Sequence, residues 1–179
     1  MKPDLSELER ESWAFALAIY AKPGVAEACL DLQHKAGVDV MLLLMAAFAA
    51  VKRRILLTPH EVKALDETCS PWREQIVQRL RAIRTELKTG PQPAPSEITE
   101  PFRSKIKAIE LEAEKLENHL LAQRLPLGQP GQQMTGLEQL HSVLIGVVRH
   151  FADKRGIKLD TGLTSSINAV AEAAIQETC

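Results

Sequence analysis

Residues 40–51, VMLLLMAAFAAV, form an uninterrupted run without a charge or a hydroxyl group. A helix that is apolar on every side has no face for water, so it must lie inside a protein core or a bilayer. Crossing a bilayer takes about 20 apolar residues, and this run is closed by Asp39 before it and by Lys52, Arg53 and Arg54 after it. The run is too short to cross, so it predicts a buried central helix.

The residues at its two ends also fit a helix. Asp39 is placed to cap the N-terminus, and the three cations follow the C-terminus, where the helix dipole favours positive charge. We therefore expect a central helix over residues 39–52. Its alanines would either let a neighbouring helix approach closely or leave room for an apolar ligand, and they are Ala46, Ala47, Ala49 and Ala50.

The composition indicates an all-α fold. Aromatic residues make up only 4% of the chain, and Val and Ile occur at helical spacing instead of in alternating runs. The hydrophobic fraction of 45% is normal for a globular protein. We expect a helical bundle of about seven or eight helices around the central one.

Charge and cysteine content bear on partners and compartment. The 22 basic and 23 acidic residues nearly cancel, so no global field attracts nucleic acid or an anionic membrane. Cys29, Cys69 and Cys179 are an odd, widely spaced set, which favours reduced thiols. The first residues are polar and lack the pattern of a secretory signal. We expect a cytoplasmic protein without membrane insertion.

Capping signals divide the first half of the chain. Ser6 and Glu9 have capping-box spacing, which predicts a helix from Ser6 to about Ala21. Pro23 opens a second helix, and Gly37 is placed to end it. Its inner stripe should be Val25, Ala28, Cys29 and Leu32.

A pair of later helices should form a hairpin. Thr58 and Glu61 form a capping box for a short helix to about Cys69, and Ser70-Pro71 predicts a new helix over residues 71–88. A Pro-rich segment then precedes a long helix over residues 101–124. Their expected apolar seams are Trp72, Ile76, Leu80, Ile83 and Leu87 on the first, and Phe102, Ile106, Ile109, Ala113, Leu116 and Leu120 on the second.

Charge should set the register of this hairpin. The first helix is basic, and the second carries Glu110, Glu112, Glu114 and Glu117, which we expect on its exposed side. Complementary flanks of this kind are typical of an antiparallel helical pair.

The domain organisation is predicted from the linkers. Residues 1–124 should form one helical bundle, and residues 125–134, rich in Gly, Pro and Gln, a linker. Residues 135–179 should then form two helices, the first with a capping box at Thr135 and Glu138 and a stop at Gly156, the second over residues 164–177. Two helices are too few for a core of their own, so they should dock on the bundle or on a partner chain.

The N-terminal third of the chain resembles a known family. The segment WAFALAIYAKPGVAEACLDLQHKAGVDVMLLLMAAFAA carries the pattern WxFALxxY, PGV, CLxLQ and GxDVxLLL. This pattern is similar to the opening of an uncharacterised family of proteobacterial proteins, and the likeness extends to about Gln123. An Asn expected at Met41 and a Trp expected near Phe48 are missing here. The resemblance implies a coherent fold and no activity.

The sequence predicts no catalytic, metal or cofactor site. No two of the five histidines are spaced four apart, and the glutamates of ELEAEKLE fan around their helix. The chain has no glycine-rich phosphate loop and no nucleophile elbow. We therefore expect no cofactor and consider an enzyme the less favoured class.

Two groups of residues remain as binding candidates. An apolar ligand could lie between the first helix and the central helix, with Gln33 and Asp39 at a polar mouth. That pocket would be lined by Trp13, Phe15, Tyr20, Gln33, Asp39 and Met45. An anion or a nucleic acid could instead bind the basic helix through Arg73, Arg79, Arg81 and Arg84.

The favoured hypothesis is a non-enzymatic helical interaction or regulatory module that binds a protein partner or forms a homo-oligomer. The seam-forming helices and the two detached C-terminal helices motivate it. An apolar small-molecule binder, or an enzyme acting on such a ligand, is the alternative, and an anion or nucleic-acid binder is the second alternative.

Overall fold

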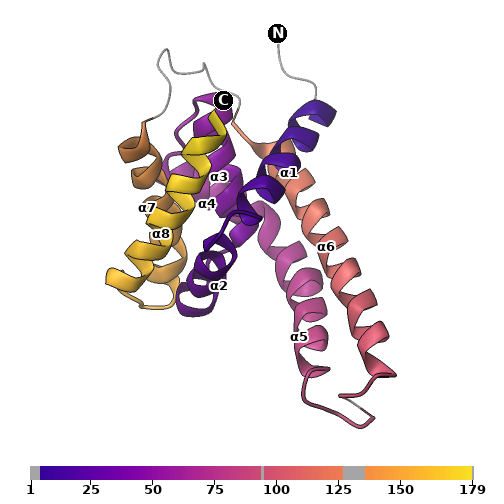
Figure 1. Cartoon of the computed structure of the whole chain (residues 1–179). Coiled ribbons are helices and arrows are strands. Elements are labelled where there is room, and N and C mark those ends of the chain that lie inside the picture. Colours follow the sequence, from indigo (N-terminus) through magenta and orange to yellow (C-terminus); the bar gives the residue numbers. More distant parts are fainter. Residues whose placement is uncertain (1–4, 94, 127–135, 179) are drawn as a thin grey trace.

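The computed structural model describes residues 5–93, 95–126 and 136–178, in which helices joined by turns and loops are the regular secondary structure and no strand occurs (Figure 1). This confirms the predicted all-α bundle. The elements are α1 (Leu5–Tyr20), α2 (Val25–Ala36), α3 (Val40–Arg53), α4 (Pro59–Trp72), the π-helical turn η1 (Arg73–Val77), α5 (Gln78–Glu86), α6 (Thr99–Arg124), α7 (Leu137–Lys154), α8 (Thr161–Ile175) and the 3₁₀ turn η2 (Gln176–Thr178).

Helix α3 is the centre of the molecule, as the sequence predicts. Every residue from Met41 to Val51 is buried, and α1, α6, α7 and α8 all pack against the helix. Asp39 caps it, because its Oδ1 accepts hydrogen bonds from the backbone N–H groups of Met41 and Leu42 at 2.9 and 3.4 Å. The small side chains of α3 let these neighbours approach closely.

Helices α1 and α2 meet at a tight corner. The buried residues of α2 include the predicted stripe, and Gly37 ends the helix in the left-handed conformation, with φ of +70°. A side chain at Gly37 would also collide with the guanidinium of Arg155. Ser6 does not cap α1, since the helix already includes Leu5. The residues that precede Leu5 lie outside the described part of the chain.

The predicted break at Ser70-Pro71 is wrong. The Thr58 capping box is present, but α4 continues through Pro71 to Trp72 and passes through η1 directly into α5. Proline has no N–H to donate to the preceding turn, and the wider π turn that follows accommodates one extra residue. That residue rotates the helix, so Val77 is buried and Ile76 is exposed.

Helices α5 and α6 project from the body as an antiparallel arm (Figure 1). The hairpin was predicted, but its predicted seam is wrong. Phe102, Ile109 and Leu116 are exposed, whereas Glu110 and Glu117, expected on the outside, are buried. The inward side of α6 is polar because arginines of the preceding helical segment face it.

Helices α7 and α8 pack against α2 and α3 and belong to the same hydrophobic core as the first helices. Gly156 follows α7 with φ of +66°, and Asp160 caps α8 by accepting a hydrogen bond from Leu163 N at 2.8 Å. Thus α8 begins at Thr161, three residues before the predicted start. The predicted cap Thr135 and nearly all of the predicted linker 125–134 lie outside the described residues.

Among the described residues, no helix combines the length and the apolar character that a bilayer crossing requires. The charges that close α3 at both ends explain this for the most hydrophobic helix of the chain.

We expect Phe48→Ala to lower the free energy of unfolding by about 3 to 5 kcal/mol, because it removes a buried ring from α3 and leaves a cavity. Urea denaturation followed by circular dichroism measures the loss. Leu17→Ala on the exposed side of α1 is the control and should change the free energy of unfolding by less than about 0.5 kcal/mol. Equal losses in both variants would contradict the central position of α3.

Candidate functional site

The six predicted pocket residues do not share one surface. Phe15 and Met45 are buried, and the ring of Phe15 packs edge-on against that of Phe48, with their centroids 5.6 Å apart. These side chains fill the space between α1 and α3. Tyr20 is more exposed, while Trp13 and Gln33 are half-buried and Asp39 belongs to a buried polar cluster.

Two hollows in the described part of the chain lie elsewhere, beside α8. A wide one of about 580 Å³ is lined by Leu159, Asp160, Thr161, Thr164, Ser165 and Asn168. A second of about 180 Å³ is lined by Leu137, Glu138, His141, Asn168 and Glu172. In the second, His141 Nε2 is buried and has no hydrogen-bond partner among the described residues. Neither hollow was predicted from the sequence.

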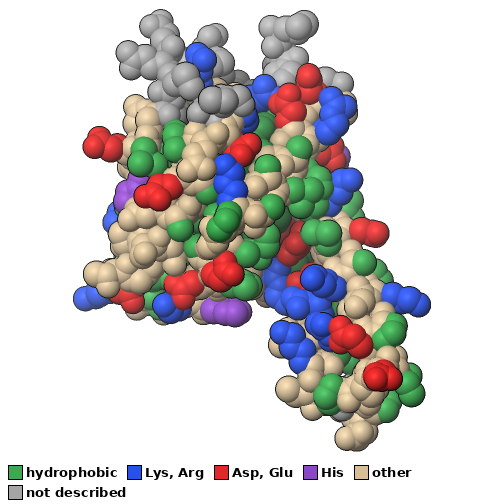
Figure 2. Space-filling model, viewed as in Figure 1, with side chains coloured by type: hydrophobic (Ala, Val, Ile, Leu, Met, Phe, Trp, Pro, Cys, Tyr) green, Lys and Arg blue, Asp and Glu red, His purple; other side chains and the backbone are tan. Residues whose placement is uncertain are grey.

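The four candidate arginines separate into paired and exposed groups. Arg81 binds Glu110 at 2.8 Å and Glu114 at 2.6 Å, and Arg84 also binds Glu110. Figure 2 shows basic side chains where the arm joins the body. Arg79 is exposed. The carboxylates of α6 therefore compete with any anion for Arg81 and Arg84.

Arg73 is the centre of a buried charged cluster. Its guanidinium donates to Asp39 Oδ2 and to Asp66 Oδ1, each at 2.5 Å. Glu117 Oε1 lies 3.8 Å from Arg73 Nη1. Because Asp39 caps α3, Asp66 lies in α4 and Glu117 lies in α6, a single side chain of η1 holds three helices together.

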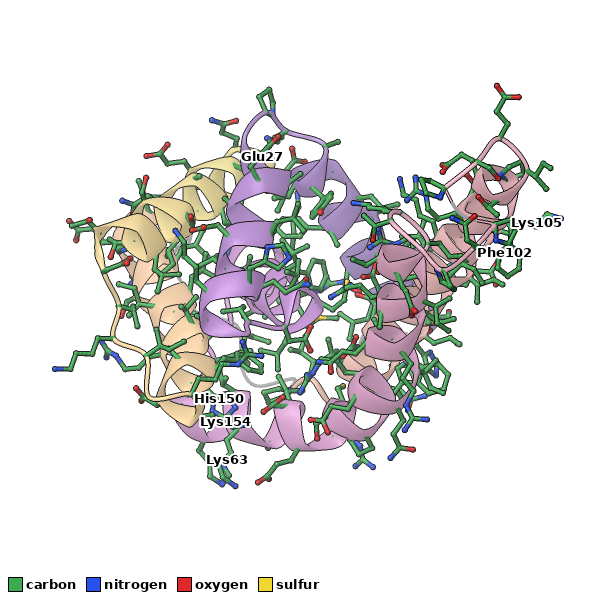
Figure 3. The ribbon with its side chains drawn as sticks, turned by 90° about the horizontal axis from the view of Figure 1, so that it is seen from below. Glu27, Lys63, Phe102, Lys105, His150 and Lys154 are labelled. Carbon is green, nitrogen blue, oxygen red and sulfur yellow. The ribbon has the colours of Figure 1, made fainter. Side chains whose placement is uncertain are left out.

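The cluster extends to α7 through Asp66. Its Oδ2 lies 2.8 Å from His150 Nε2 and also accepts from Lys154 Nζ. His150 and Lys154 lie at the side of the molecule away from the arm that carries Phe102 and Lys105 (Figure 3). Asp66 is therefore shared by groups from η1 and α7, and the cluster connects the C-terminal helices to the rest of the body.

The pKa values of Asp66 and Glu117 shift in opposite directions in this environment. Burial alone would raise the pKa of Asp66, but hydrogen bonds from Lys154 and His150 and the charge of Arg73 outweigh it and hold the pKa below its usual range. Burial, reinforced by Asp39, raises the pKa of Glu117 to about 10. Glu117 is thus protonated at neutral pH and can donate a hydrogen bond to Asp39.

Sequence reasoning found Arg73 and Asp39 but missed the other members of this cluster. Asp66, His150 and Lys154 occupy ordinary positions on amphipathic helices, and 84 residues separate Asp66 from His150. Glu117 was predicted on the exposed side of its helix, so no local signal pointed to its place in the cluster. The cluster joins several helices and can keep a proton on a buried carboxyl group. The described residues contain no group of His, Cys, Asp and Glu arranged to bind a metal ion.

The two described cysteines are unreactive because their thiols are buried. Cys29 and Cys69 are both free and buried. Burial raises the pKa of each thiol to about 12, so neither forms the thiolate that nucleophilic chemistry requires at neutral pH.

The arm presents an apolar surface beside its paired charges. Phe102, Ile109 and Leu116 are seven residues apart, which is nearly two helical turns, so they form one line along α6. Ile83 of α5 is also exposed. Ile83 and the α6 line are each reached by rotating in the same sense about their own helix axis, away from the side where the two helices touch. In an antiparallel pair such residues lie on the same side of the pair, so Ile83 lies beside the α6 line. We call Ile83, Phe102, Ile109 and Leu116 the arm face.

Comparison with protein families gives one match. The family described as a protein of unknown function (DUF2390) matches residues 11–121. The chain belongs to this family. The match ends within α6, so α7 and α8 lie outside it. Comparisons with curated proteins and with solved structures found no match.

We expect Arg73→Met to lower the free energy of unfolding by about 3 kcal/mol or more, because it leaves the carboxylates of Asp39 and Asp66 buried with fewer partners. Urea denaturation measures the effect. Arg79→Met in the neighbouring exposed position should change stability by less than about 0.5 kcal/mol. A loss of similar size in both variants would contradict a specific role of the cluster.

We expect Glu117→Gln to stabilise the protein, and more at pH 8 than at pH 5. An unfolded chain loses the Glu117 proton at its ordinary pKa of 4.5, whereas the folded protein retains it up to about 10. Between these values the folded state binds more protons, so the free energy of unfolding of the wild type falls as pH rises. Glutamine does not titrate, and it preserves the hydrogen bond to Asp39. Because Asp66 is present in both proteins, its contribution to the pH dependence cancels when the two are compared.

The gain at pH 8 should reach at least about 1 kcal/mol, which corresponds to roughly one pKa unit. Urea denaturation at both pH values measures it, with Glu86→Gln at an exposed position of α5 as the control. A constant difference between wild type and Glu117→Gln across this pH range would show that Glu117 is ionised in the folded protein.

Proposed function

We propose that this protein is a non-enzymatic helical interaction module that binds a helix of a protein partner through the arm face. One observation carries the proposal. Phe102, Ile109 and Leu116 have the spacing of a coiled-coil seam, yet they are 53%, 47% and 52% exposed.

The energetics of the arm support this function. Fully burying one large apolar side chain contributes about 1.5 to 3 kcal/mol, so covering the arm face would supply enough free energy for a moderately tight complex. The same residues do not hold the arm together, because its inner side is occupied by Arg81, Arg84 and Glu110. The apolar line is therefore available to a partner.

The shape of the molecule also supports the proposal. The arm extends beyond the body (Figure 1), so a partner helix can lie along it without displacing the core. An amphipathic helix laid into an apolar groove is a recurrent mode of peptide recognition. We place this module in the cytoplasm, where the buried free thiols Cys29 and Cys69 would remain reduced.

The chain offers a matched pair of residues for testing the proposal. Ile109 and Leu111 lie in the same helix and are both 47% exposed, but two residues of helix turn them to opposite sides of α6. We expect Ile109→Ser to lose bound partners that Leu111→Ser retains. Quantitative affinity enrichment from the cell of origin, with wild-type protein as reference, measures this difference.

Circular dichroism and urea denaturation must accompany the enrichment. We expect both variants to unfold within about 0.5 kcal/mol of the wild type, because the substituted side chains are half exposed. Retention of the same partners by Ile109→Ser and by Phe102→Ser would show that the arm face is not the binding surface.

A further inference from the structure

We infer that the partner of the arm face is a second copy of this chain, bound so that the two α6 helices lie antiparallel across a twofold axis. This inference rests on the proposed function and names its partner. It is carried by charges at the edge of the arm face whose order along α6 fits a reversed copy of the same helix.

The charges in question are Lys105 and Glu112. Both are exposed. Ile106 and Ala113 lie on the α5 side of the apolar line, and the residue before each of them is turned past the line to its other edge. Lys105 and Glu112 therefore lie on the edge of the apolar line that faces away from α5. Neither forms an ion pair within the part of the chain that the structure describes. Figure 3 shows Lys105 beside Phe102 on the arm, away from the body.

The register follows from these positions. When one α6 lies antiparallel on another, residues of the same flank meet each other. A twofold axis between Ala108 and Ile109 brings Lys105 of each copy to Glu112 of the other. The same axis brings Phe102 close to Leu116 of the second copy and Ile106 close to Ile109.

Apolar and charged contacts thus agree on a single alignment. Sliding one helix by a heptad would preserve the apolar spacing but break both Lys–Glu pairs, and it would place Glu112 against Glu112 or Lys105 against Lys105, depending on the direction. A parallel alignment would place the Lys105 and Glu112 edges of the two copies on opposite sides of the pair, so no Lys105–Glu112 contact could form. The order of charges therefore selects the antiparallel twofold arrangement.

The size of the surface suits a reversible dimer. The line from Phe102 to Leu120 is about 27 Å long at 1.5 Å per residue, and two adjacent helices are about 20 Å wide. The two arms together would bury roughly 1,100 Å², near the lower limit for specific interfaces. We expect a dimer that dissociates in the micromolar range.

Charge reversal tests the register. Lys105→Glu puts two pairs of like charges into its own dimer, and Glu112→Lys does the same with positive charges. We expect each variant alone to raise the dissociation constant of the dimer at least about tenfold at low salt. An equimolar mixture of the two variants should recover wild-type affinity. In the mixed dimer the introduced carboxylate of one variant faces the introduced ammonium group of the other, and the second pair is the original Lys105 with Glu112.

Sedimentation velocity from about 1 to 100 µM, a range that brackets the expected dissociation constant, measures each case. Lys107→Glu makes the same charge change on the other side of α6 and should leave the dimer unchanged. Monomeric wild-type protein at the highest concentration, or a mixture no tighter than its components, would overturn the inference. If Ile109→Ser still loses its captured partners in that event, the arm binds a different protein and the proposed function stands.

Discussion

The enclosure of α3 is the constraint on which the rest of this structure depends. An apolar helix without a polar face is stable in water only when neighbours cover it on every side, and α1, α6, α7 and α8 supply that cover. The last two of these helices lie beyond the region that matches the DUF2390 family. In this chain the C-terminal helices therefore complete the core around a helix that the family region provides.

Covering α3 creates an electrostatic problem at its N-terminus. Asp39 must stay near the first turn to cap the helix, and this brings a carboxylate into the interior, where an unpaired charge is costly. The guanidinium of Arg73 forms an ion pair with Asp39 and a second one with Asp66. Asp66 also forms ion pairs with His150 and Lys154. Burial, reinforced by the neighbouring carboxylate of Asp39, raises the pKa of Glu117 and favours its protonated form.

The arm places its apolar and charged side chains in the opposite way from the body. In the body, apolar residues face inward and charges lie at the surface, whereas in the arm Arg81 and Arg84 meet Glu110 between the helices and the apolar line faces outward. Charge pairs of modest strength hold such a hairpin together, and its apolar side chains are left exposed on the outer side. This contrast is the physical basis for the proposal that the arm binds a partner, while the buried core of the body supplies stability.

The sequence by itself determined the features that depend on neighbours within a few residues. The length of α3, the caps at Asp39 and Thr58, and the left-handed Gly37 were predictable because each follows from hydrogen bonds or conformations of one local segment. Only the tertiary structure decided which side of α6 faces inward. An apolar stripe and an acidic stripe lie side by side on that helix, and the choice between them depends on the arginines that α5 presents after the π turn at Arg73. Contacts such as Asp66 with His150 join distant segments, so no local pattern could specify them before the helices were packed.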